Sequence, residues 1–213
     1  MWGLSNKKVL LWGGLLVVLI FIILLSSHAF TPKTAVQLSS KNPAPATLAG
    51  IQNSAAPWPA EVEHLSERLD AMGLPKLKNV GTALHIHPHV DIFIDGQPVT
   101  IPPGVGINMA DGFIAAIHTY DTSGVLHIQP ATVRTFTLGQ FFDTWGVDFT
   151  SKRIGIYQTD SNKTLKVFLN GKQYPGDPQQ PILKDSEEIV VAYGTEQELP
   201  NPIPSEYILP PGY

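Results

Sequence analysis

Hydrophobic residues recur along this chain with two different periods, and the periods predict its elements. Between residues 60 and 72, apolar side chains recur at three- and four-residue steps, the spacing of one helix face; they are Val62, Leu65, Leu69 and Met72. A second such stretch follows Thr137, a favourable N-cap, and carries Leu138, Phe141, Phe142 and Trp145. The pattern predicts two short helices, ended by Gly73 and Gly146.

From Ala83 onward the period becomes two, which is typical of half-buried strands. Asp95-Gly96 is a strong hairpin turn, and centring on it pairs Ile92 with Val99 on the core face. Further strands or hairpins are expected at 113–120 with 125–129, at 153–158, at 165–174 around Asn170-Gly171, and at 189–192. We therefore expect an α+β fold, built mainly from antiparallel β hairpins with two short helices.

The N-terminus predicts a membrane segment. An uncharged apolar stretch, residues 9–27, follows Lys7 and Lys8, and about 20 apolar residues span a bilayer. Residues 1–30 are therefore predicted to form a transmembrane signal-anchor, although the small residues around His28 would also suit cleavage by a signal peptidase. The two lysines place the short N-terminus in the cytoplasm, so a single-pass protein with an extracytoplasmic C-terminal domain is expected.

Composition divides the remainder into three parts. Residues 31–59 are dominated by Ala, Pro, Ser and other small or polar residues, which predicts a flexible linker. Residues 60–198 hold all the periodic segments and form the predicted α+β domain. The tail, 199–213, contains five prolines and is expected to be an extended strap or a free end.

Charge and cysteine content exclude several functions. The 213-residue chain has a formal net charge of −4 and no run of Lys or Arg, so nucleic-acid binding is not expected. It has no cysteine, which excludes disulfides, iron–sulfur clusters and blue-copper sites. Any metal must be held by other side chains or by backbone oxygens.

Histidine supplies the candidate chemistry. Five of the seven histidines fall between residues 85 and 127, and neutral imidazole is the commonest protein ligand for zinc and copper. A turn centred between Thr122 and Ser123 would place two of them directly opposite each other on a hairpin. The candidate ligands of a copper or zinc ion are His85, His87, His89, His118 and His127.

The sharpest hypothesis is that His87, His118 and His127 bind one ion, with His85 or His89 as a fourth ligand or an outer neighbour. Two carboxylates, Asp91 and Asp121, are candidates to accept the second ring N–H of a ligand. Asp121 is also expected to begin its turn through hydrogen bonds to its own backbone. Pro88 is tolerated on an edge or bulged strand, so His85 and His87 are expected on such a segment, with His89 pointing differently. His64, beside the apolar stripe of the first helix, is interpreted as a surface or packing residue.

These motifs resemble a broad group of uncharacterised, membrane-anchored or secreted bacterial and archaeal proteins. The similar segments are His85-Ile86-His87-Pro88-His89, Asp95-Gly96, His118-Thr119-Tyr120-Asp121, Ser123-Gly124, His127, Leu138-Gly139-Gln140-Phe141-Phe142 and Asn170-Gly171. Tyr120 stands where the group often has another histidine, which makes it a candidate neighbour of the metal. The group has no established activity, so the resemblance supports the site and not a function. The order of elements also resembles a β-grasp arrangement with an inserted hairpin.

The favoured function is a membrane-anchored extracytoplasmic protein that binds copper or zinc, and metal handling is the role considered for it. No general base stands out beside the histidines, so a catalytic role is less favoured and no catalytic residue is assigned. Two alternatives stay open: a metal-dependent hydratase or hydrolase with three histidines and an open water position, and a non-catalytic interaction module at the membrane surface. Cupins and alpha-type carbonic anhydrases also use strand His-x-His ligands, but the cupin glutamate and second motif are missing, and the chain is too short for that anhydrase fold.

Overall fold

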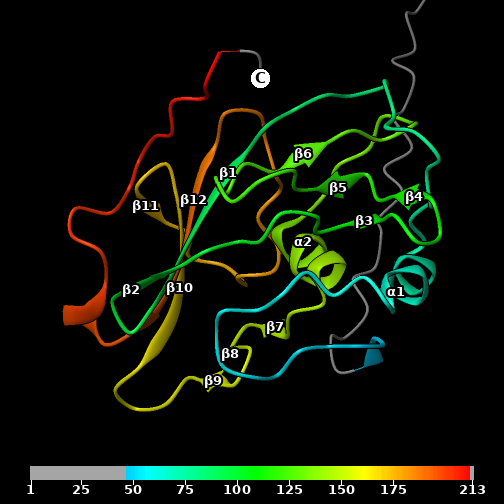
Figure 1. Cartoon of the computed structure of the whole chain (residues 1–213). Helices are drawn as coiled ribbons and strands as arrows, with labels where there is room; N and C mark the ends of the chain where they lie inside the picture. The colour runs from blue at the N-terminus through cyan, green and yellow to red at the C-terminus, as the bar shows by residue number, and fades with distance from the viewer. Residues whose placement is uncertain (1–46, 212–213) are drawn as a thin grey trace, which may run out of the picture. The chain divides into compact units, whose positions relative to one another are not determined.

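The computed structural model of the chain describes residues 47–211, all of which fall within one compact unit, Leu38–Tyr213. This part has the predicted α+β composition, with mostly antiparallel strands and two α-helices (Figure 1). Among the described residues, no helix has the length and apolar character that crossing a membrane requires. The predicted transmembrane segment, residues 9–27, lies outside the described residues.

A five-stranded sheet forms the frame of the domain, in the order β11-β10-β12-β1-β2. Its strands are β1 (His89–Ile94), β2 (Gln97–Val99), β10 (Thr164–Leu169), β11 (Lys172–Gln173) and β12 (Glu188–Gly194). Central strands β1 and β12 run parallel, with His89 opposite Glu188, and the other neighbours are antiparallel. The sheet therefore joins two hairpins through one parallel pair.

Both predicted hairpins of this sheet are confirmed. Asp95 and Gly96 have positive φ and connect β1 to β2, with Ile92 opposite Val99. Asn170 and Gly171 do the same between β10 and β11. Positive φ at both central residues is the requirement of a type I′ turn, which Asn-Gly and Asp-Gly satisfy at low cost.

The two helices have the predicted ends, although the first begins later than expected. Helix α1 spans Leu65–Met72, where residues 60–72 were predicted, and Gly73 ends it in the left-handed region. Helix α2 spans Leu138–Trp145, and Thr137 caps it as predicted: its hydroxyl accepts the backbone N–H of Gln140, whose side chain accepts the N–H of Thr137. This reciprocal pair satisfies two N–H groups that the first helical turn leaves unpaired.

Helix α2 lies at the centre of the domain and every one of its residues is buried. One side of the sheet faces the main apolar core, which includes Phe141 and Phe142 of α2 and Ile92 and Val191 of the sheet. Strand β5 (Ile117–His118) also contacts α2, and it pairs with β6 (His127–Ile128). The helix is thus the support on which the histidine-bearing hairpin rests (Figure 1).

Short strands complete the domain. Strand β3 (Ile107–Asn108) pairs with β4 (Phe113–Ile114), and β7 (Phe149–Thr150), β8 (Arg153–Ile154) and β9 (Tyr157–Gln158) form a three-stranded meander. The single strand predicted at 153–158 is therefore a tight hairpin. A 3₁₀ turn, η2 (Glu196–Glu198), follows β12.

The C-terminal tail runs along the face of the sheet opposite to α2 (Figure 1). Leu199 and Ile203 pack there on a small apolar cluster formed by Phe93, Phe168, Val190 and Ala192. Of the two arrangements expected for the tail, the structure shows the strap.

The predicted flexible linker, 31–59, overlaps the described residues from 47 onward, and there the chain is packed rather than free. Trp58 is 1% exposed and meets Trp145 edge to face, with ring centroids 5.8 Å apart. Gln52 bonds through its backbone N–H to the carbonyl of Gly146. The small, proline-rich composition did not indicate this packing, in which Leu48 and Trp58 are buried. The folded part therefore begins before residue 60.

Candidate metal centre

Three histidines, His118, His127 and His87, lie side by side on three neighbouring chain segments and form the histidine row. The predicted register of the second hairpin is confirmed, because His118 of β5 lies directly opposite His127 of β6. On the other side of β6, the bridges Ile86 to Ile128 and His89 to Val125 fix an antiparallel register that places His87 opposite His127. Residue 127 is thus the middle member of the row, and one face of three adjacent segments carries imidazoles.

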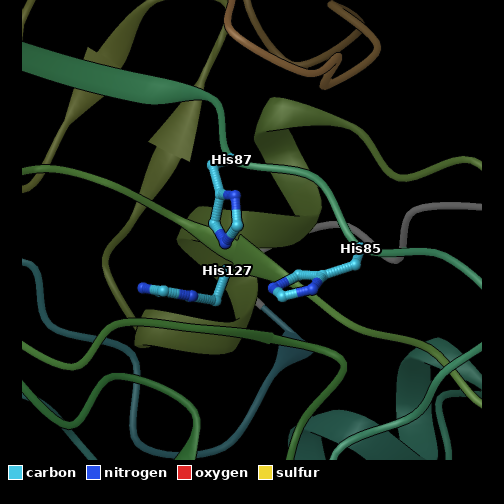
Figure 2. A group of neighbouring side chains, drawn as sticks. All are labelled: His85, His87 and His127. Atoms are coloured by element: carbon cyan, nitrogen blue, oxygen red, sulfur yellow. The ribbon is translucent and has the colours of Figure 1, made fainter. Parts of the chain in front are cut away.

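His85, His87 and His127 offer ring nitrogens that all lie within 4.8 Å of one another (Figure 2). The ring centroids are 4.5 Å apart for His85 and His87, and 4.7 Å apart for His87 and His127. His85 lies two residues before His87, so both side chains leave the segment on the same side. Their rings point toward that of His127 from the facing strand (Figure 2).

His118 lies behind this group. Its ring stacks on that of His127 at 15° with centroids 5.5 Å apart, and its side chain is fully buried. Nδ1 lies 3.1 Å from the carbonyl of Ala115, and because a carbonyl only accepts, Nδ1 carries the hydrogen. Nε2 is then the acceptor nitrogen; it is buried, and the side chain of Gln129 lies beside it.

Burial keeps these rings neutral. It lowers the pKa of His118 and of His127 to about 4, and the neighbouring imidazoles add to both shifts. Burial and then the charge of His85 also lower the pKa of His87. Neutral imidazole is the form that binds a metal, so His87, His118 and His127 are in their binding form at neutral pH.

Tyr120 covers the outer side of the row. Its ring meets those of His118 and His127 edge to face, at 4.8 and 4.5 Å between centroids, and the side chain is half exposed. Tyr120 also lines an open cavity of about 610 Å³ whose walls include Phe113, Ile114 and Met109. The phenol therefore separates the histidines from a space large enough for a small organic molecule.

His89 does not join this group. Its Nδ1 lies 2.7 Å from Oε2 of Glu188, its Nε2 lies 2.8 Å from the carbonyl of Ser123, and Tyr207 of the tail stacks on its ring at 3.8 Å. Burial acts to lower the pKa of His89, but the hydrogen bond and charge of Glu188 outweigh it and the pKa is raised. Asp91 lies with this pair rather than beside the other histidines.

The remaining candidates have local partners. Asp121 accepts the backbone N–H of Ser123 at 2.8 Å, as its turn role predicts. His64 contacts Glu61, three residues before it in the chain, in agreement with a surface or packing role. The Pro88 segment lies along β6, where the Pro88 carbonyl accepts the N–H of Leu126. Proline has a carbonyl that can accept this hydrogen bond, but it has no backbone N–H to donate a second one to β6.

Acidic residues before β12 lie beside the histidine run. Glu187 and Glu188 are buried, and Asp185 accepts the backbone N–H of His87 at 2.9 Å. Only the parallel pairing of β1 with β12 brings them to the histidine run. Nothing local in the sequence signals this contact.

The row has the chemistry of a nitrogen site for a transition metal. Zinc and copper bind imidazole nitrogen at about 2.0–2.1 Å, which places ligand nitrogens roughly 3.3 Å apart. The three nitrogens, now within 4.8 Å, reach that spacing by small rotations of side chains that already converge. Comparison with protein-family models, curated proteins and solved structures finds no match for this chain. A functional assignment therefore rests on this geometry.

Proposed function

We propose that this protein binds one copper or zinc ion through His85, His87 and His127, with His118 as an inner neighbour able to supply a fourth nitrogen. The observation that carries the proposal is the convergence of three imidazoles from two segments that lie about 40 residues apart in sequence. A folded scaffold that brings three imidazoles together offers a metal ion three nitrogen ligands at once.

The buried Nε2 of His118 supports the same proposal. Its Nδ1 carries the hydrogen, so Nε2 is the ring nitrogen with a lone pair, and that is the nitrogen a metal ion binds. The Nδ1 hydrogen bond to the Ala115 carbonyl fixes the tautomer that presents Nε2, as outer-shell partners do at known metal sites. Copper(II) is ranked above zinc because it binds nitrogen sites more tightly in the usual affinity order.

Titration of the full-length, metal-free protein with Cu²⁺ and Zn²⁺ in a calorimeter tests this proposal. We expect one tightly bound ion per chain at the histidine row, and His87→Ala and His127→Ala should each weaken its binding about tenfold or more, since even outer-shell changes have effects of that size. His64→Ala is the matched control, because His64 also contacts a carboxylate but lies outside the row. Equal binding by the parent and all three variants would show that the histidine row is not the site.

A second candidate function, a metal-dependent hydratase or hydrolase, is favoured by the cavity beside Tyr120. Three histidines leave a coordination position for water, and a bound metal lowers the pKa of that water enough to make a nucleophile. X-ray absorption of the zinc-loaded protein distinguishes the two functions. Four nitrogen ligands would favour binding alone, whereas three nitrogens and one oxygen would favour catalysis.

The proposal includes a location and a fold type. Residues 9–27 with Lys7 and Lys8 support a single-pass anchor that leaves the domain extracytoplasmic. The strand order β2-β1-β12-β10-β11, with a parallel central pair and a helix on one face, supports a β-grasp arrangement with the histidine hairpin inserted between β2 and α2.

A further inference from the structure

We infer that His89, Asp91 and Glu188 form a second cation site, which takes a divalent ion that prefers mixed nitrogen and oxygen ligands, such as Mn²⁺. Each residue offers one ligand atom, and these atoms lie within 4.8 Å of one another. None of the three belongs to the histidine row, so the inference stands independently of the proposed function.

The sheet itself creates this group. His89 lies opposite Glu188 across the parallel pair β1 and β12, and Asp91 follows two residues later on β1. Side chains alternate between the faces of a strand, so all three project from the face that the tail covers. The residues that follow on that face include the apolar side chains of Phe93 and Val190, so the polar group lies beside an apolar patch.

His89 is oriented as a metal-binding histidine is. Its Nε2 lies 2.8 Å from the Ser123 carbonyl, which only accepts, so Nε2 carries a hydrogen. Nδ1 then faces the carboxylates, with Oε2 of Glu188 at 2.7 Å, so a bound cation would displace to solvent the proton that these two atoms share. A backbone carbonyl on one ring nitrogen is the usual means of aiming the other at a metal.

Glu188 supplies the observation that points beyond an ordinary ion pair. Its side chain is 1% exposed, and Oε1 is buried with no hydrogen-bond partner among the described residues. One imidazole cannot satisfy two buried carboxylate oxygens with Asp91 also nearby, because uncompensated buried charge is costly. A divalent cation between the three ligand atoms would balance both carboxylates and use the free oxygen.

Two carboxylates and one imidazole define the class of cation. Carboxylate oxygens suit harder divalent ions such as Mn²⁺, which an all-histidine site binds poorly. Tyr207 stacks on the His89 ring at 3.8 Å and 7°, so the tail closes one side of the site. The two sites should therefore differ in metal preference.

Titration of the metal-free, full-length protein with Mn²⁺, followed by the loss of the free-ion electron paramagnetic resonance signal, tests the inference. We expect the parent to bind Mn²⁺, and Asp91→Asn and Glu188→Gln each to weaken binding about tenfold or more. Glu63→Gln is the control, since Glu63 belongs to an acidic group with Glu61 and His64 elsewhere on the domain. The double variant His87→Ala/His127→Ala should keep its Mn²⁺ site, which separates this result from the proposed function.

Thermal unfolding in chelator shows whether each variant is folded. Asp91 is only partly buried, so Asp91→Asn is expected to fold. If Glu188→Gln fails to fold, the Mn²⁺ affinity of Asp91→Asn alone tests the inference. Absence of Mn²⁺ binding by the parent, or equal binding by the parent and Asp91→Asn, would overturn the inference and leave His89 and Glu188 as a structural ion pair. Loss of Mn²⁺ binding in the double variant would also overturn it, by assigning the ion to the histidine row.

Discussion

Lowering the pH should cost the metal-free protein about 3 kcal/mol of unfolding free energy through His118 alone. Burial lowers the pKa of this ring from 6.5 to about 4 in the folded state. The unfolded chain therefore takes up a proton at higher pH than the folded one, so stability is complete above about 6.5 and falls as the pH drops toward 4. Denaturant unfolding in chelator at several pH values measures this loss.

The variant His118→Gln isolates the effect. Glutamine does not titrate, so the difference in unfolding free energy between the parent and the variant should shrink as the pH falls through this window. His64→Gln is the control, because His64 is partly exposed and its pKa is raised by the hydrogen bond to Glu61. Parallel pH profiles for the parent and His118→Gln would contradict the prediction. Excess zinc should make the parent's profile steeper, since protonated rings cannot bind it.

Features set by neighbouring residues were predictable from the sequence. Asp95-Gly96 and Asn170-Gly171 demand positive φ, so their turns fix the register of the strands beside them. The pairing of His118 with His127 follows in the same way from the turn that lies between them. In each of these cases the residues of the turn determine the strand register.

Features set by distant pairings were not predictable. The contact of His87 with His127 depends on the segment before β1 lying along β6, and alternation alone cannot tell which edge a strand will join. The separation of His89 from the row has the same origin, because its partner Glu188 comes from a parallel strand about 100 residues later. The sequence therefore predicted a histidine site while leaving open which histidines share it.

Helix α2, which supports the histidine-bearing hairpin, contains a buried acid. Asp143 of α2 is fully buried, and neither carboxylate oxygen has a hydrogen-bond partner among the described residues. Arg68 lies beside it but directs its guanidinium to the Glu61 carboxylate and to backbone carbonyls, including that of Asp143 itself. Burial therefore outweighs the attraction of Arg68 and raises the pKa of Asp143 from 3.8 to about 7.

Replacing Asp143 with Asn should stabilise the protein at alkaline pH by up to about 4 kcal/mol. The folded state holds a proton on Asp143 that the unfolded chain releases near pH 3.8, so the parent loses stability as the pH rises from about 4 to about 7. Asparagine has the shape of the protonated acid and no charge to bury, so parent and variant should be similar near pH 4 and diverge above it. Asp70→Asn, which changes a largely exposed acid on α1, should show no such divergence. Unfolding free energies at pH 4, 6 and 8 measure the effect, and a constant difference across that range would mean that Asp143 is ionised in the folded protein throughout.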